Sequence, residues 1–325
     1  MDLLDRLRLE RPVVQAGMGG GIATAPLAAA VSSAGGLGTV GILAPRLLAA
    51  ELRRAATRVA PRPVAVNLIV PFTRRAHVDA AVDGGASLCV LSFGFMPWAV
   101  ARLRSAGIVV LHQVGTVAEA RRALRDGADG LIAQGREAGG HLVGVRPTLE
   151  FLPDALETAG GRPVLAAGGI HDGAGARAAM SAGAAAVVAG TRFLLTEECS
   201  AHPAYKRRVC GAERTLETTL FGFGWPLRHR VVPNAATERW LRAGREPRWM
   251  RALSHASAAL GRVVPMEASD VLASRGWLPP SPNPALAGQP DAAVDAAPLY
   301  AGECARHIDA VLPAAAAVAA LDPRG

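Results

Sequence analysis

The sequence is short of clustered cysteines and of long apolar runs, and each shortage excludes a class of protein. Its four cysteines lie far apart without CxxC or CxH spacing, so we expect reduced thiols and neither a disulfide framework nor a metal site. No segment reaches the roughly 18 uninterrupted apolar residues of a membrane span. The first residues alternate acids and bases and do not resemble a secretion signal. We therefore expect a cytoplasmic protein that contacts no membrane.

Acidic residues are fewer than basic ones, and where the excess positive charge lies in the chain matters more than its total. The net charge is +8, and the segment 206–262 alone carries eleven Arg and one Lys against four Glu, so the rest of the chain is neutral on balance. That segment has no helix-turn-helix, zinc-finger or RNA-platform signature, and we do not expect nucleic-acid binding. Two interpretations stay open: a solvated Arg-rich face, or a surface that attracts anionic substrates or an acidic carrier protein.

What the sequence does contain is a repeated strand and helix pattern. Short runs rich in Val, Ile and Leu are each followed by a polar or glycine turn and a stretch of helical period, which is typical of βα units. The eight predicted strands are 13–18, 37–42, 64–70, 88–93, 108–114, 130–135, 163–169 and 186–191. Runs this apolar are buried on both faces of a parallel sheet. Because an open doubly wound sheet usually has about five or six strands, the pattern predicts a closed α/β (β/α)8 TIM barrel.

The βα pattern fails after residue 209. Residues 210–295 mix Trp, Arg and Pro with patchy helical period and include a Pro/Gly-rich stretch at 278–290. We predict three parts: the barrel over 1–209, an inserted and mostly helical cap over 210–295, and a C-terminal helix within 296–325 that returns to the barrel.

Motifs of covalent catalysis are absent from the chain. There is no GxSxG and no GxxxxGK[ST], and the single lysine, Lys206, lies outside the predicted strands. A barrel enzyme that forms a Schiff base needs a lysine on a strand, so aldolase-type chemistry is excluded.

Glycines dominate the predicted strand ends, where a barrel builds its active site. Turns of this kind after the last two strands, at Gly168-Gly169 and at Gly190-Thr191, bring backbone amides close to an anion and predict a phosphate site. The alternative is that these glycines only make tight βα turns. Other side chains and glycines predicted at the rim are Gly17, Met18, Asn67, Gln113, Gln134, Gly139 and Gly140.

His141 is the candidate catalytic residue. It follows a Gly-Gly run at the predicted barrel mouth, has no CxxC or HxxxH partner that would make it a metal ligand, and titrates near neutral pH as a general base should. Glu137 either orients His141 or caps the next helix. His171 follows the predicted phosphate turn and is a candidate to assist it, whereas we expect His112 to pack in or under the rim.

Several of these motifs occur together in one known family. They are QAGM at 15–18, AGGLG at 34–38, VN at 66–67, EAGGH at 137–141, AAGGI at 166–170, GTRF at 190–193 and AHPAYK at 201–206. Together the motifs resemble the nitronate monooxygenases, formerly called 2-nitropropane dioxygenases, over about residues 10–209. They are also similar to the flavin-dependent enoyl-ACP reductases.

The resemblance implies a barrel that binds FMN, with the phosphate at Gly168, Gly169, Gly190 and Thr191. It places the flavin ring near Gly17, Met18, Asn67 and the Gly139-Gly140-His141 loop. The amides of Asn67 and Gln113 then either bind the ring or satisfy backbone groups in the barrel mouth. Many family members carry a Lys and an Asp where this chain has Gln113 and Gln134.

The implied activity is oxidation of an alkyl nitronate or nitroalkane by molecular oxygen to a carbonyl compound and nitrite. In that reaction His141 deprotonates the neutral nitroalkane or orients the nitronate. Two alternatives stay open. One is an NAD(P)H-dependent enoyl-thioester reductase whose Arg-rich cap docks an acidic carrier protein, and the other is a flavin-binding protein without turnover. An oligomer is compatible with the sequence.

Overall fold

Eight parallel strands form one closed sheet in the computed structural model, which describes residues 3–222, 225–242, 244–257 and 282–324. The strands are β1 (Val13–Gln15), β2 (Gly38–Val40), β3 (Val64–Ile69), β4 (Leu88–Ser92), β5 (Val109–Val114), β6 (Gly130–Gln134), β8 (Val164–Ala167) and β9 (Ala186–Ala189). Strand β1 pairs with β9, and a parallel bridge from Val14 to Leu37 joins it to the β2 side. The predicted TIM barrel is therefore confirmed.

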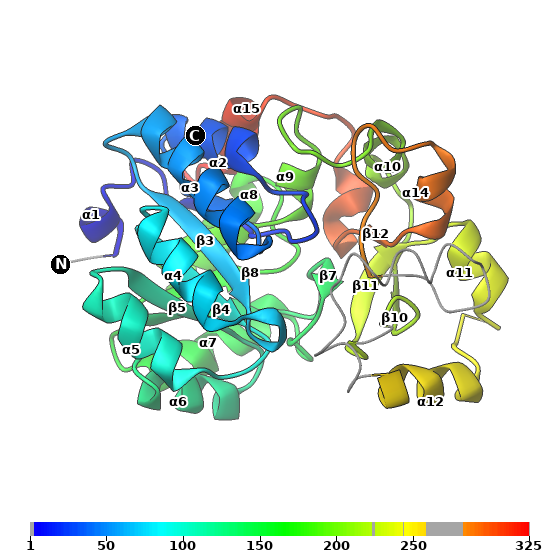
Figure 1. Cartoon of the computed structure of the whole chain (residues 1–325), viewed down its shortest axis with the longest axis horizontal. Helices are drawn as coiled ribbons and strands as arrows, with labels where there is room; N and C mark the ends of the chain where they lie inside the picture. The colour runs from blue at the N-terminus through cyan, green and yellow to red at the C-terminus, as the bar shows by residue number, and fades with distance from the viewer. Residues whose placement is uncertain (1–2, 223–224, 243, 258–281, 325) are drawn as a thin grey trace.

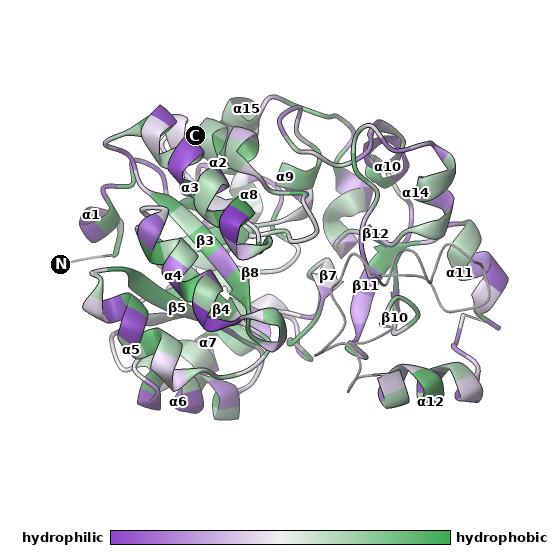
Figure 2. Ribbon diagram, viewed as in Figure 1, coloured by the Kyte–Doolittle hydropathy of each residue, from purple (hydrophilic) through white to green (hydrophobic). Residues whose placement is uncertain are grey.

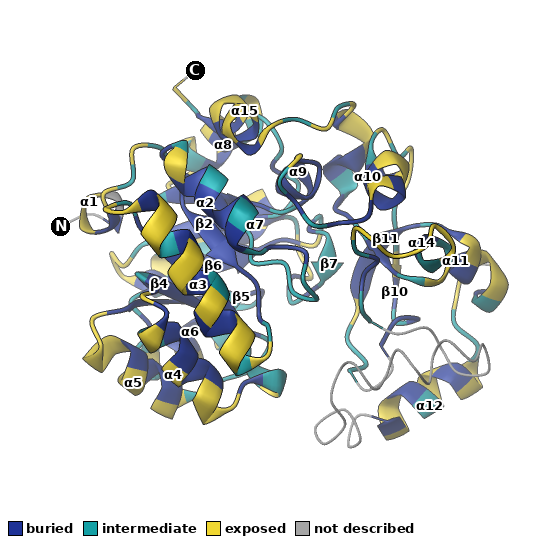
Figure 3. Ribbon diagram, turned by 45° about the horizontal axis from the view of Figure 1, so that its top comes forward, coloured by how far each residue is buried: buried dark blue, intermediate teal, exposed yellow. Residues whose placement is uncertain are grey.

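Helices cover the outside of the barrel (Figure 1). They are α1 (Leu3–Leu7), α2 (Ala25–Ser33), α3 (Pro45–Val59), α4 (Arg75–Asp83), α5 (Pro97–Ser105), α6 (Val117–Arg125), α7 (Thr148–Ala159), α8 (Gly173–Ser181), α9 (Thr191–Leu194) and α15 (Ala314–Leu321). Helices such as α3, α4 and α5 have a buried face and an exposed face, as their dark and yellow sides in Figure 3 show. In α3 the buried set Leu48, Leu52, Ala55 and Val59 recurs at helical spacing, and arginines occupy the opposite face.

The strands themselves are mostly apolar, as the largely green ribbons of the sheet in Figure 2 show, and their polar residues, such as Asn67, Gln113 and Gln134, lie towards their carboxyl ends. Every residue of β4 and β6 is buried, because one face packs on helices and the other fills the barrel. Inside the barrel, residues such as Leu88, Leu111 and Leu165 form a packed core. The barrel is thus closed below, and only its carboxyl-terminal mouth is open to a ligand.

A second, smaller sheet lies beside the barrel mouth. It is antiparallel and consists of β10 (Leu216–Thr218), β11 (His229–Val232), β12 (Leu299–Tyr300) and β7 (Gly140–His141). Around it lie α10 (Pro203–Val209), α11 (Ala235–Trp240), α12 (Arg248–Ser257), α14 (Ala292–Ala296) and two short 3-10 helices, η1 (Val70–Phe72) and η3 (Glu303–His307). Figure 1 shows β7 between the barrel and the rest of this sheet.

The described part of the predicted cap contains helices α11, α12 and α14, and it also contains two strands, β10 and β11, that were not predicted. Strands β10 and β11 have three and four residues, too short for an alternating pattern to be recognised. Strand β10 pairs with β11, and β11 also pairs with β7 and β12, which lie outside the predicted cap. Residues 258–281, which include the start of the predicted 278–290 linker, lie outside the described residues. The boundaries at 209 and 295 stay predictions.

The C-terminal segment runs back to the barrel, where α15 packs against α2 and α8. The guanidinium of Arg192 helps hold this segment by donating to the carbonyls of Leu195 at 2.7 Å and Ala310 at 2.6 Å. Among the described residues, no helix has the length and apolar character needed to cross a bilayer.

Candidate functional site

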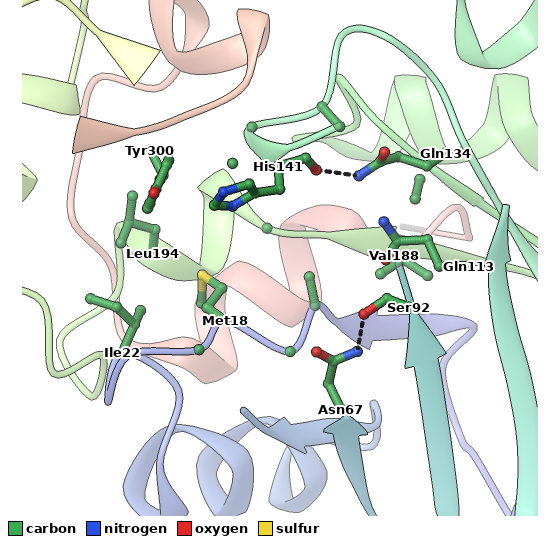
Figure 4. Close-up of a pocket in the computed structure, with 18 of the residues that line it drawn as sticks. Met18, Ile22, Asn67, Ser92, Gln113, Gln134, His141, Val188, Leu194 and Tyr300 are labelled. Atoms are coloured by element: carbon green, nitrogen blue, oxygen red, sulfur yellow. Dashed lines mark hydrogen bonds between the residues drawn. The ribbon is translucent and has the colours of Figure 1, made fainter. Parts of the chain in front are cut away.

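A cavity of about 230 Å³ opens at the barrel mouth, between the strand ends and the small sheet. Figure 4 shows Met18, Asn67, Gln113 and Gln134 around it, with the His141 imidazole projecting into it. All the residues predicted for the site line this cavity: Gly17, Met18, Asn67, Gln113, Gln134, Gly139, Gly140, His141, Gly168, Gly169, Gly190 and Thr191. The structure therefore brings the predicted set together, while the role of each member stays a prediction.

The turns after β8 and β9 leave backbone amides directed to a ligand. Gly168 and Gly169 have φ angles of +121° and +71°, which disfavour any residue with a side chain. The amides of Gly169 and Gly190 form no hydrogen bond with any described residue. A Cβ at Gly190 would meet only Ala16, at 3.7 Å, so the space beside this turn is open. Unpaired amides beside open space are what a phosphate group requires, and the turns fit one.

Two predicted cofactor residues also have structural tasks. A Cβ on Gly17 would overlap the Cβ of Asn67, so a glycine is needed here for the segment after β1 to pass against Asn67 on β3. The hydroxyl of Thr191 accepts the amide of Gly302 at 2.9 Å, which ties the turn after β9 to the C-terminal segment.

The three side-chain amides at the barrel mouth differ in how many hydrogen bonds they form within the protein. Asn67 donates to the Val90 carbonyl at 3.3 Å and to the Ser92 hydroxyl at 3.4 Å. The amide of Gln134 binds the backbone of the loop that follows it. The side chain of Gln113 forms no hydrogen bond with a described residue although it lines the cavity, so it is the amide best able to bind a ligand.

His141 is held in an aromatic setting and is not on a loose turn. It belongs to β7 and pairs with His229 on β11. The indole of Trp225 stacks on its imidazole, with ring centroids 3.9 Å apart, and Tyr300 lies at 5.4 Å. Burial, and secondarily the nearby His229, lowers the pKa of His141 well below its usual value. The imidazole is therefore neutral at physiological pH, and one of its nitrogens is free of a proton. The expectation that His141 titrates near neutral pH is wrong, because burial disfavours the charged imidazolium.

The Nε2 atom of His141 is buried and has no partner among the described residues. A buried polar atom without a partner is costly in a folded protein, unless a ligand supplies the missing hydrogen bond. This atom is the clearest sign of a reacting group beside the cavity.

The aromatic neighbours of His141 were missed by sequence reasoning. Phe93, Trp225, His229 and Tyr300 come from four separate segments, and no spacing rule links them to residue 141. One local signal was available for Phe93, because it is the last residue of a predicted strand and Gly94 follows it.

The other predicted residues fall outside the reacting centre. Glu137 caps α7, with its carboxylate accepting the Thr148 amide at 3.0 Å and the Thr148 hydroxyl at 3.1 Å, and it does not orient His141. His112 is buried under the rim, where it stacks on Phe95. His171 contacts the Gly169 carbonyl through Nδ1 at 3.2 Å, beside the predicted phosphate turn. Among the described residues, no cluster of His, Cys, Asp or Glu is arranged to hold a metal ion.

The model of the nitronate monooxygenase family matches residues 2–83 and 70–242 of the chain. The chain belongs to the nitronate monooxygenase family. As a member, it is a flavin-dependent oxidoreductase.

Proteins similar to this chain in sequence or structure carry the names of different enzymes. The chain is 38% identical, over 246 residues, to a (3aS,4S,5R,7aS)-5-hydroxy-7a-methyl-1-oxo-octahydro-1H-indene-4-carboxyl-CoA dehydrogenase of Mycobacterium tuberculosis, a match that covers 73% of this chain and 67% of that one. FabK from Thermotoga maritima has a similar structure, with a TM-score of 0.77, 26% identity and coverage of 98% and 94%. A nitroalkane oxidase from Streptomyces ansochromogenes superposes with a TM-score of 0.75, 27% identity and coverage of 98% and 96%.

Proposed function

We propose that this member of the family binds FMN and oxidises an alkyl nitronate or nitroalkane with molecular oxygen, giving a carbonyl compound and nitrite. The observation that carries the proposal is the neutral Nε2 of His141, without a partner among the described residues, at a cavity that the glycine turns at Gly168-Gly169 and Gly190-Thr191 also line. The similarity to a nitroalkane oxidase supports it.

Different residues around the cavity would bind different parts of the cofactor. The turns at Gly168-Gly169 and Gly190-Thr191 would hold the phosphate, and Gly17, Met18 and Gln113 would lie along the flavin ring. The flavin, when bound, supplies an acceptor for the electrons of the substrate.

His141 takes the proton from the carbon beside the nitro group through Nε2. Its low pKa keeps that nitrogen free of a proton over the neutral pH range. The apolar walls around it exclude water, which strengthens every polar contact made inside the cavity. A nitronate that enters as the anion has already lost this proton and needs only to be oriented.

The absorbance spectrum of the purified protein tests the cofactor, since oxidised flavin bands are expected. Oxygen consumption with propionate-3-nitronate and with a neutral nitroalkane then tests the reaction. His141→Ala should keep FMN and lose turnover of the neutral nitroalkane far more than turnover of the anion. Exposed His255 on α12 provides the control, because His255→Ala should change neither activity. Equal losses on both substrates in His141→Ala would show that His141 is not the base.

A second candidate function is chemistry on an acyl thioester. The Mycobacterium tuberculosis relative is named for a CoA thioester, and the carbon beside a thioester carbonyl is, like that beside a nitro group, a weak carbon acid. The described part of the cap adds four exposed arginines without ion-pair partners among the described residues, Arg242, Arg245, Arg248 and Arg251. Such a face suits a phosphorylated or acidic carrier.

Oxidation of NAD(P)H by a crotonyl thioester would favour an enoyl-thioester reductase over a nitronate monooxygenase. Reduction of bound flavin by a saturated acyl-CoA, without NAD(P)H, would favour a dehydrogenase. The nitronate proposal predicts neither reaction at a rate comparable with nitronate turnover.

A further inference from the structure

Trp225 joins the small sheet to the barrel mouth through three aromatic contacts. Its indole lies over the imidazole of His141 at 3.9 Å between centroids, with the two planes inclined by 25°. It also meets the ring of Phe72 at 5.1 Å and 82°, and that of Phe93 at 5.0 Å and 89°. Both edge-to-face contacts have the geometry that aromatic pairs prefer. Phe72 follows β3 and Phe93 follows β4. Two loops at the barrel mouth therefore contact the side chain of Trp225, which belongs to a segment outside the barrel.

The backbone of Phe93 supports this arrangement. Phe93 has a φ of +63°, in the left-handed region that residues with a side chain rarely adopt. Such strain persists only where the surroundings enforce it, and it concentrates at functional sites. Here it directs the ring of Phe93 against Trp225 and towards His141, at 6.1 Å between centroids.

Of the described aromatic rings in contact with the imidazole of His141, that of Trp225 is the nearest. His229 on β11 and Tyr300 on β12 are the titratable groups in ring contact with His141, at 5.1 and 5.4 Å between centroids. From the barrel side, Met18 and Leu194 line the cavity near His141 and carry no charge.

Arg230, which follows His229 on β11, has its positive charge balanced by two carboxylates. The guanidinium of Arg230 pairs with Glu217 at 2.7 Å and with Glu303 at 3.0 Å. The environment that surrounds His141 is therefore set by uncharged rings, and the nearest of them is the indole.

We propose that Trp225 is the positioning residue of the base: it fixes the plane of the His141 imidazole, shields that imidazole from water and keeps Nε2 directed into the cavity. The inference rests on the proposed role of His141. Because a stacked indole restricts rotation of the ring beneath it, the proton-accepting nitrogen stays in one orientation. Because the indole excludes water, the imidazole stays neutral down to a pH at which an exposed histidine is protonated.

The test compares Trp225→Ala with Trp225→Phe in the flavin-loaded protein. In Trp225→Ala we expect kcat for a neutral nitroalkane to fall about 10-fold to 100-fold, a partial loss of the roughly 100-fold to 10,000-fold that positioned acid–base catalysis contributes. Turnover of the nitronate anion should fall less than about threefold, since the anion needs no base. The acid limb of kcat/KM for the neutral substrate should move to higher pH by about one unit or more, because the hydrated imidazole regains its ordinary pKa. Trp225→Phe keeps an aromatic ring over His141. Its kcat for the neutral nitroalkane and its acid limb should therefore stay close to those of the wild type.

Phe72→Ala is the matched control, because it removes one edge contact to Trp225 and leaves the face of His141 covered. It should not move the acid limb. If Trp225→Ala does not fold, Trp225→Leu fills the space without an aromatic face and should give the same shift. An acid limb that stays in place in both variants, or equal losses on the two substrates, would overturn the proposal.

A readout that needs no turnover separates this inference from the proposed function. The pKa of His141 can be followed by NMR in the flavin-loaded protein, with His141→Ala used to assign the signal. A rise in that pKa in Trp225→Ala but not in Phe72→Ala supports the placement of Trp225 even if the wild-type protein turns over no nitroalkane. An unchanged pKa in an active protein refutes the placement alone.

Discussion

The side chain of Gln134 at the end of β6 holds the backbone of His141. Its Nε2 donates to the His141 carbonyl at 3.3 Å, as the dashed line in Figure 4 shows, and its Oε1 accepts from the amides of Val143 at 2.8 Å and Gly144 at 3.3 Å. One buried amide therefore fixes the loop that carries the proposed base. Gln134 was predicted at the rim of the barrel, and it does line the cavity. Its hydrogen bonds, however, are made to the protein.

Gln134→Ala should destabilise the fold and misplace the base. The two amides would lose their acceptor, and a buried donor without a partner costs about 1–3 kcal/mol. We expect a lower midpoint in urea unfolding, retained FMN, and reduced turnover of neutral nitroalkane. Gln289→Ala is a suitable control, because Gln289 also accepts a backbone amide but is exposed. Unfolding and activity that match the wild type would show that the loop is held by other contacts.

Gly190→Val should prevent FMN binding without unfolding the barrel. A methyl group at this position meets only Ala16 at an ordinary contact distance of 3.7 Å, so the backbone accepts it. The branched side chain, in contrast, projects into the space that the phosphate needs. Gly190→Ala is the matched variant and should keep more flavin. The measurement is flavin content after purification together with thermal unfolding of the flavin-free proteins. Stoichiometric flavin in the valine variant would contradict the phosphate assignment.

The stability of the protein should fall on mild acidification. Burial lowers the pKa of His112 and of His141, and that of His229 to about 4. Unfolded histidines take up protons near pH 6.5, so below that pH the unfolded state binds more protons than the folded state. The free energy of unfolding is therefore unaffected by these groups above about pH 7 and decreases as the pH falls from about 6.5 towards the folded pKa values.

Each such histidine contributes up to about 1.4 kcal/mol per pH unit within that window. Urea unfolding at pH 7.5, 6.0 and 5.0 measures the slope. His112→Phe keeps the ring that stacks on Phe95 and should make the slope shallower, whereas exposed His255→Phe should leave it unchanged. Equal stability at pH 7.5 and 5.0 would show that the buried imidazoles do not control acid unfolding.

The residues that could be predicted from the sequence are those whose signal is local. The strands of the barrel are continuous apolar runs, and the turns at Gly168-Gly169 and Gly190-Thr191 follow two of them directly. Because parallel strands all end at the same edge of the barrel, the predicted site residues had to meet at one mouth. Glu137 shows the limit of this reasoning: its two alternative roles were separated only when Thr148 was found within hydrogen-bond distance.

The amino-acid sequence alone determined the closed barrel, its glycine-rich mouth and the presence of a histidine there, because each follows from periodicity or from what a short turn requires. The tertiary structure decided what surrounds that histidine. Pairing of β7 with β11, and the contact of Trp225 with Phe72 and Phe93, join segments more than 80 residues apart in the chain. Such contacts depend on how separately folded segments pack together, and no local pattern of residues encodes them.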